Sequence, residues 1–270
     1  MRFASFNVAF FGVDSQWQRD HDDLALLGQT IDSLDADVVA FQEIVDLPLF
    51  GSVLAGLSNR RYLTQDAEGN WLSSGLPTEM GTYDQKNVVA FDPNVLTLKS
   101  WSKVLGAFRR QPVAAQFEMV DSGRVLTVCG VHLESPSRLD DEQDKDYQRR
   151  QEECRGLGGW LTASGAFPAS PGTAEVVVLG DFNGTIDGRI GNATGDGDPS
   201  LRELRSALIG WAWDVPSLPG GEWGWTTEID EAVIDFILLS PSLVGVPRIH
   251  VLESRVSDHR PVVVDVEYVE

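Results

Sequence analysis

The sequence has 270 residues, enough for one large domain that buries most of its apolar surface without disulfides or structural metals. Its 41 acidic and 21 basic residues give a formal net charge of −20, which disfavours tight DNA binding unless local arginines or bound cations outweigh it. No run of about 18 apolar residues is present. We therefore expect a single domain over 1–270, no stable membrane insertion and no obligate protein partner.

The first residues, MRFASFNVAFF, contain one arginine, a polar interruption from Ser5 to Asn7 and no small-residue cleavage site. They predict a first strand instead of a signal peptide. The two cysteines are Cys129, in an apolar strand pattern, and Cys154, in a helical pattern. We expect two buried thiols instead of a disulfide, which favours a reducing, cytoplasmic location. An export signal already removed is the alternative.

The hydrophobic pattern predicts eleven helices and strands along the chain. In chain order these are a strand over 2–8, a helix over 21–34, strands over 38–42, 87–91 and 124–133, a helix over 140–161, a strand over 176–179, a helix near 199–208, and strands over 233–239, 248–252 and 262–266. Helices between some strands and hairpin-like spacing between others favour a mixed α/β sandwich over a purely parallel sheet.

Apolar strands in this sequence repeatedly end in a polar residue suited to chemistry. The strand VVVL is followed by GDFN, in which Asp181 and Asn183 are separated by one residue. These residue types are typical of a turn, but strand ends in α/β sheets are also where ligands bind. In the same way Asn7 follows SF, Glu43 follows VVAFQ and His132 follows CGV.

Asp235 lies inside the apolar run VIDFILL, where a buried charge is costly unless it is paired or binds a metal. Either alternation turns its side chain to solvent, or it orients a histidine by a hydrogen bond, as in a catalytic triad. Of the four histidines, we expect His21 to be solvated and His250 to be structural. His132 and His259 adjoin the polar motifs VHLES and SDHRP and are the candidates for chemistry.

Six motifs, SFNV, FQE, VHLES, GDFN, IDFILLS and SDHRPV, occur in that order between Asn7 and about Val264. Together they resemble the endonuclease/exonuclease/phosphatase family, to which DNase I, neutral sphingomyelinases and inositol polyphosphate 5-phosphatases belong. The resemblance implies a four-layered α/β sandwich, with two mixed β-sheets packed face to face and flanked by helices. It also implies phosphoester hydrolysis that depends on Mg²⁺ or Mn²⁺.

The resemblance also implies a metal site. By its place in the motifs, Glu43 resembles the principal metal ligand of the family, helped by Asn7 and Asp258. Oxygen donors of this kind suit a hard cation that keeps several of its waters.

The remaining motif residues resemble catalytic groups of the family. His259 resembles the residue that deprotonates or aligns the attacking water, with Asp235 as its orienting partner. Asp181 and Asn183 resemble the pair that positions the nucleophile and stabilises the transition state. His132 resembles a phosphate-contacting histidine that protonates the leaving oxygen. Phosphodiester hydrolysis needs these functions, because a water must be activated and developing negative charge must be stabilised.

Two weaker similarities concern loops. LPTEMGTYDQKNVVAF resembles the DNase I segment that carries a glutamate paired with the phosphate-contacting histidine, which would make Glu79 that partner and let Lys86 and Asn87 face phosphate. An acidic loop residue is, however, usually just solvated. WGWTTEID resembles the loop that carries substrate-contacting aromatics in several members, so Trp223 and Trp225 either contact substrate or pack in the core.

His132 separates the chain from the AP-endonuclease branch, and GDFNGT and IDFILLS lack the extended signatures of the 5-phosphatases. The substrate class we expect is a phosphodiester, as nucleic acid or a nucleotide-like ester. The alternative is a phosphomonoesterase acting on a small phosphorylated metabolite, or on an inositol or sphingolipid phosphoester. The pairs Arg109-Arg110 and Arg149-Arg150 are candidate contacts to nucleic acid, unless they only solvate a helix surface.

Overall fold

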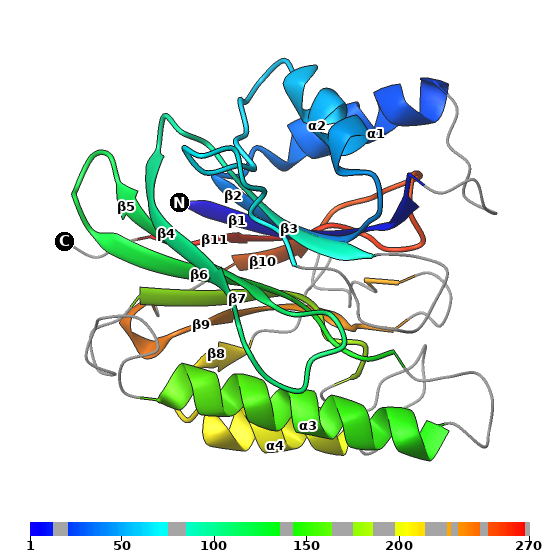
Figure 1. The fold of residues 1–270 in the computed structure, drawn as a ribbon, viewed down its shortest axis with the longest axis vertical. Helices are drawn as coiled ribbons and strands as arrows, with labels where there is room; N and C mark the ends of the chain where they lie inside the picture. The colour runs from blue at the N-terminus through cyan, green and yellow to red at the C-terminus, as the bar shows by residue number, and fades with distance from the viewer. Residues whose placement is uncertain are drawn as a thin grey trace.

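The computed structural model describes residues 1–12, 21–74, 85–135, 143–163, 175–185, 198–213, 226–227, 232–243 and 248–267. Two β-sheets pack face to face, and a pair of helices covers the outer face of each sheet (Figure 1). The helices are α1 (His21–Leu34) and α2 (Leu47–Ala55) on one side, and α3 (Gln143–Thr162) and α4 (Pro199–Ala207) on the other. The predicted four-layered α/β sandwich is confirmed. Within the described ranges, no helix combines the length and apolar character needed to cross a membrane.

The first sheet has five strands in the order β10-β11-β1-β2-β3. Their bounds are Arg2–Phe11 for β1, Val38–Ile44 for β2, Lys86–Phe91 for β3, Arg248–Val251 for β10 and Val262–Asp265 for β11. Strands β1 and β2 are parallel, and the other pairs are antiparallel. The sheet is therefore mixed, as the sequence pattern indicated.

The second sheet has six strands in the order β4-β5-β6-β7-β9-β8. Their bounds are Leu96–Lys103 for β4, Val113–Met119 for β5, Val125–His132 for β6, Glu175–Asp181 for β7, Ala212–Trp213 for β8 and Asp235–Leu239 for β9, which the short 3-10 helix Pro241–Leu243 follows. Only β6 and β7 run parallel among these paired strands.

The central strands β2, β6 and β7 are largely apolar because both faces of each sheet are covered. In β6, Leu126 and Val128 point between the sheets, whereas Cys129 and Val131 pack against α3 and α4. In β1, Phe3 points between the sheets, and its neighbours on the other face pack against α1 and α2. This alternation fixes which strand positions can reach the space between the sheets.

Both cysteines are free and buried, as expected from their positions in apolar patterns. Cys129 lies in β6 and Cys154 in α3. Burial raises the pKa of each thiol. Both therefore stay protonated and unreactive at neutral pH.

Each predicted helix and strand is present, and the described residues form five further elements: α2, β4, β5, β8 and the 3-10 helix Pro241–Leu243. The sequence signals for α2 conflict, because Pro48 and Gly51 interrupt its apolar run, yet Asp46 caps its start by accepting a hydrogen bond from the Leu49 N–H at 2.9 Å. Strand β4 lies at the edge of the second sheet, and its polar residues are largely exposed. An edge strand of this kind carries little hydrophobic pattern.

Gly180 allows β7 to pass close to β6 just before Asp181. Its φ is +155°, and a Cβ built at this position would lie 2.0 Å from the Val131 carbonyl oxygen. Backbone on a neighbouring strand cannot move aside without breaking the ladder, so only glycine fits here.

We expect Gly180→Ala to lower the free energy of unfolding by about 3 kcal/mol or more, because the added methyl meets backbone at an unfavourable φ. Urea denaturation measures this change. Gly159→Ala is the matched control, because nothing lies within 4 Å of the added methyl in α3. That control is expected to raise stability by up to about 1 kcal/mol. Wild-type stability of Gly180→Ala would contradict the geometric argument.

Candidate active site

Polar side chains replace apolar ones at one end of the space between the sheets. On the second sheet, His132 of β6 is in register with Asp181 of β7, which is in register with Asp235 of β9. By alternation along its strand, each of the three lies on the face that points between the sheets, as Val128, Val177 and Ile237 do in β6, β7 and β9. All three polar side chains are at most 2% exposed. The register therefore places an imidazole and two carboxylates side by side.

The first sheet contributes Asn7 of β1 from the opposite side. Its Nδ2 donates to Asp181 Oδ2 at 3.0 Å and to Glu43 Oε1 at 3.1 Å. Its Oδ1 accepts from the Ala9 N–H at 3.0 Å. A single amide thus joins a carboxylate of the second sheet to one of the first.

Irregular backbone turns Glu43 toward this site. Strict alternation in β2 would place Glu43 on the helix-covered face with Phe41. Instead Glu43 has a φ of +64°, and the pairing of β2 shifts between Phe41 and Ile44. Phe10 of β1 also has a positive φ, of 50°, and donates its N–H to Glu43 Oε2 at 3.0 Å. These distortions in adjacent strands aim the carboxylate at the site, a common role of bulges.

His259 is held against Asp235. Its Nδ1 lies 2.9 Å from Asp235 Oδ2, and its Nε2 lies 3.8 Å from Asp181 Oδ2. Ser257 fixes the backbone, because its Oγ accepts from the His259 N–H at 3.1 Å and donates to the Asn7 carbonyl at 2.7 Å. Burial by itself lowers the pKa of His259, but Asp235 outweighs it and raises the pKa to about 10.

His132 has the opposite tendency. Its Nε2 lies 3.5 Å from Asp181 Oδ2 and 3.9 Å from Glu43 Oε1. Burial, together with the positive charges of Arg110 and His259, holds the pKa of His132 well below its ordinary value. The site therefore combines one imidazole whose neutral form is favoured, His132, with one whose charged form is favoured, His259.

The site has more negative charge than its own donors balance. Burial and the nearby Asp235 carboxylate raise the pKa of Asp181 to about 7. One donor atom from each of Asp181, Asp235 and His259 lies within 4.8 Å of the others. A divalent cation would offset this buried charge, and the oxygen donors suit a hard ion, so the residues present fit a metal.

Asn183 explains the Asp-x-Asn spacing after β7. Its φ is +51°, and its N–H donates to Asp181 Oδ1 at 2.8 Å, which forms a tight Asx-type turn. Its Nδ2 donates to the Leu133 carbonyl at 2.9 Å, next to His132. The GDFN sequence is therefore a turn and also part of the site.

The sequence matches the profile of the Endonuclease/Exonuclease/phosphatase family over residues 4–259. The chain belongs to this family. The family's hydrolases act on phosphoester bonds, and its members generally use divalent metal ions. A comparison with curated proteins gives no match.

Solved structures share the fold at low sequence identity. The human Nocturnin catalytic domain with bound sulfate is 16% identical, with a TM-score of 0.65 over 100% of this chain and 94% of that one. A mannosyl-6-phosphatase of Bacteroides thetaiotaomicron is 14% identical, with a TM-score of 0.68 over 99% and 100%. TDP2 of D. rerio, complexed with a single-strand DNA product, is 14% identical, with a TM-score of 0.63 over 98% and 97%. At these identities the likeness shows the fold alone.

The other residues predicted for the site are placed less centrally. Asp258, beside His259, is half-buried and accepts from Ser257 Oγ at 3.4 Å. Lys86 is half-buried in β3, with its Nζ 3.5 Å from the Val45 carbonyl. Asn87 is buried, and its Nδ2 donates to the Gln111 carbonyl at 3.3 Å. Glu79, Trp223 and Trp225 lie outside the described residues.

The sequence interpretation of Arg150 as a surface contact is wrong. Its side chain is 1% exposed and is paired with Asp198, so it cannot reach a substrate backbone. Arg109 and Arg149 are partly exposed, but both approach the buried Glu134, at 2.5 and 3.7 Å. A charged residue in a helix is usually exposed, and this tendency led to the wrong prediction that Arg150 lies on the surface.

Gln85 is a site residue that the sequence did not reveal. Its Nε2 donates to Glu43 Oε2 at 3.1 Å, and its Oε1 accepts from Arg110 Nη1 at 3.0 Å. Arg110 in turn donates through Nη2 to the Leu133 carbonyl at 2.7 Å. A single glutamine before a strand carries no motif, so only the fold could identify this contact.

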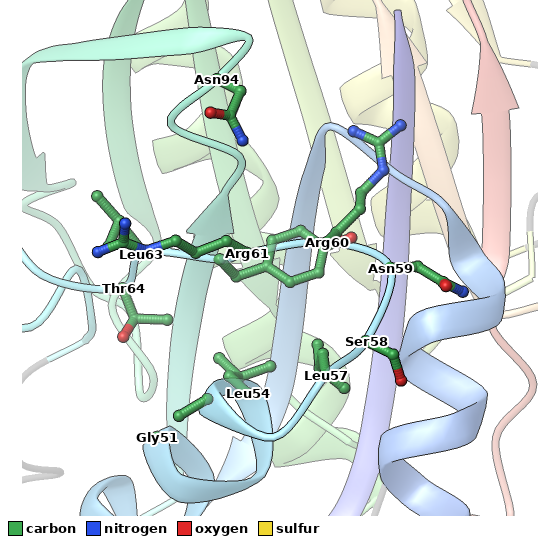
Figure 2. A pocket seen from close by; sticks show the side chains of 12 residues that line it. Gly51, Leu54, Leu57, Ser58, Asn59, Arg60, Arg61, Leu63, Thr64 and Asn94 are labelled. Carbon is green, nitrogen blue, oxygen red and sulfur yellow. The ribbon is translucent and has the colours of Figure 1, made fainter.

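A cavity of about 610 Å³ lies elsewhere, lined by the end of α2, the segment that follows it and Asn94 (Figure 2). Its lining includes no carboxylate and no histidine. Figure 2 shows the side chains of Arg60 and Arg61 pointing in opposite directions. Arg60 is already paired with aspartates, Asp37 at 2.7 Å and Asp92 at 3.1 Å. The cavity lining therefore offers neither a histidine base nor carboxylate ligands for a metal.

We expect Gln85→Ala to weaken Mn²⁺ binding by about tenfold, because Glu43 is predicted to be a metal ligand and outer contacts of this kind orient ligand carboxylates. Isothermal titration calorimetry of the metal-free protein measures the affinity. Gln151→Ala is the matched control, since Gln151 also donates to a glutamate, Glu203 at 2.9 Å, but on the α3–α4 surface. Equal Mn²⁺ affinities for the two variants would contradict a role for Gln85.

Proposed function

We propose that this protein is a divalent-metal-dependent phosphoesterase that hydrolyses a phosphodiester bond in nucleic acid or a nucleotide-like ester. The observation that carries the proposal is the His259–Asp235 pair, joined at 2.9 Å and directed at the buried Asp181 carboxylate. A carboxylate-oriented imidazole next to a cluster of oxygen donors is suited to activating water for attack on phosphorus. Membership of a family of phosphoester hydrolases supports the same reaction class.

In this proposal the neutral form of His259 takes the proton from the attacking water at Nε2, and a bound cation would favour that form by offsetting the Asp235 and Asp181 charges that raise the pKa of His259. Asp235 holds Nδ1 and stabilises the imidazolium that forms. Asp181 lies 3.8 Å from Nε2, where it orients the water between them. The water oxygen then bonds to phosphorus as the bond to the leaving oxygen breaks.

Asn183 and His132 stabilise the negative charge that develops on the phosphate oxygens. Both border the Leu133 segment, because Asn183 Nδ2 donates to its carbonyl at 2.9 Å and His132 precedes it. The neutral imidazole of His132 provides an N–H donor without the cost of burying a cation. We assign His132 to the leaving oxygen and Asn183 to a non-bridging oxygen.

Mg²⁺ or Mn²⁺ is the proposed cofactor, held by Glu43 with Asn7 and Asp258. When bound, such an ion neutralises charge on the phosphate and lowers the barrier to attack. The surplus of buried carboxylate charge around Asp181 supports a cation at this edge of the sandwich.

A phosphomonoesterase acting on a small phosphorylated metabolite is the second candidate. The net charge of −20 favours a small substrate over a long polyanion. The two substrate classes are each represented among proteins of similar fold, by a mannosyl-6-phosphatase and by a DNA-product complex.

The substrate class is tested by incubating the protein and Mg²⁺ with supercoiled plasmid, with bis(p-nitrophenyl) phosphate and with a panel of phosphomonoesters. Turnover of the diester, with or without plasmid nicking, supports the first candidate. Monoester turnover with intact plasmid and diester supports the second. EDTA is expected to abolish turnover and added Mg²⁺ or Mn²⁺ to restore it, whereas full activity in EDTA would refute metal dependence.

We expect His259→Ala and Asp181→Ala each to lower kcat by about a thousandfold, through loss of the base or of water positioning. Steady-state kinetics with the substrate identified above measures the loss. His250→Ala is the control for His259→Ala, because His250 lies in β10 and does not belong to the cluster of Asp181, Asp235 and His259. Near wild-type turnover of either site variant would refute the role assigned to that residue.

A further inference from the structure

A guanidinium is completely buried behind the site. Arg150 of α3 is 1% exposed and packs over the ring of Tyr147, with 4.9 Å from its Cζ to the ring centroid. It is paired with Asp198, which is buried at the N-terminus of α4. Burying an arginine is costly, so its position needs contacts that repay the loss of hydration.

One end of the Arg150 fork holds the segment that follows His132. Arg150 Nη1 donates to the Glu134 carbonyl at 2.8 Å. Glu153, one turn further along α3, accepts from the Glu134 N–H at 2.6 Å. Helix α3 therefore fixes both backbone groups of a residue only two positions after His132.

The other end holds the turn that carries Asn183. Arg150 Nη2 contacts Asp198 Oδ2. The Asp198 N–H donates to the Thr185 carbonyl at 2.7 Å, and a Cβ at Gly184 would lie 2.9 Å from Asp198 Oδ2. Asp198 is thus in close contact with the two residues that follow Asn183.

The segments after β6 and β7 also contact each other directly, because Asn183 Nδ2 donates to the Leu133 carbonyl and the Leu133 N–H donates to the Asp181 carbonyl. Arg150 adds a rigid planar link behind them, since a guanidinium fixes two partners at once where an ammonium fixes one. A buried ion pair contributes little net stability compared with apolar residues of similar volume. A gain in folding stability therefore does not explain why an arginine is buried at this position.

We propose that Arg150 is a positioning residue that locks the His132 segment to the Asn183 turn. It keeps the His132 imidazole and the Asn183 carboxamide at the separation needed to stabilise a phosphate between them. The inference rests on the proposed phosphoesterase function and extends it from the site itself to helix α3.

The test compares Arg150→Lys with wild type, because lysine keeps the charge next to Asp198 but cannot also reach the Glu134 carbonyl. With bis(p-nitrophenyl) phosphate and Mg²⁺, we expect kcat to fall about tenfold and KM to change less than about twofold. In ¹H–¹⁵N spectra, the Asn183 side-chain amide is expected to shift. Asp198→Asn, which retains the helix cap, is expected to give the same pattern and serves if the first variant does not fold.

Arg155→Lys is the matched control. Arg155 lies on the same helix and pairs with Glu203 of α4 at 2.7 Å, but both side chains are about half exposed and away from the site segments. It should keep wild-type kcat and an unshifted Asn183 amide. A similar loss of kcat in Arg155→Lys would show that any substitution at the contact between α3 and α4 lowers kcat, and would overturn the proposal.

The proposed function and this inference fail in different ways. If the wild-type protein hydrolyses no phosphoester, the function is refuted, and the Asn183 amide alone then decides the role of Arg150. An unshifted amide in both Arg150→Lys and Asp198→Asn overturns the inference, whatever happens to kcat. A shifted amide with unchanged kcat also overturns it, because the link would then not affect catalysis.

Discussion

The carboxylate of Asp181 is buried between the two sheets, where an ionised group is stable only if donors or cations surround it. Asn7 reaches it from the first sheet, the Asn183 amide reaches it from its own turn, and His259 approaches it from the C-terminal part of the chain. At the end of the sandwich where Asp181 lies, the two sheets are therefore joined through polar contacts. The same contacts assemble the site.

The two histidines show how environment divides roles between identical side chains. His259 is paired with Asp235, so its charged form is favoured, whereas His132 is buried among positive groups, so its neutral form is favoured. Groups with pKa values moved in opposite directions are characteristic of acid–base sites. The division arises from packing: the register of β7 and β9 sets Asp235 beside Asp181, where it pairs with His259, and the segment between β4 and β5 brings Arg110 to the His132 carbonyl.

Unfavourable backbone conformations concentrate around the site. Glu43, Phe10 and Asn183 have positive φ, and Gly180 tolerates a close approach that no other residue could make. Regular strands would have directed these side chains elsewhere, so the packed sandwich must hold the irregular segments in place. The extensive core on both faces of each sheet supplies that rigidity.

The sequence motifs by themselves identified the family and, through that resemblance, the four layers, because short motifs are local patterns that can be read without the fold. They also singled out Asn7, Asp181, Asp235 and His259, which the structure brings together. The sequence could not determine the direction of Glu43, since a bulge reverses the alternation on which strand patterns depend. It also could not locate Gln85 or the burial of Arg150, whose partners Glu43 and Asp198 lie 42 and 48 residues away in the chain. Such contacts depend on how the sheets and helices pack, and only the tertiary structure decided them.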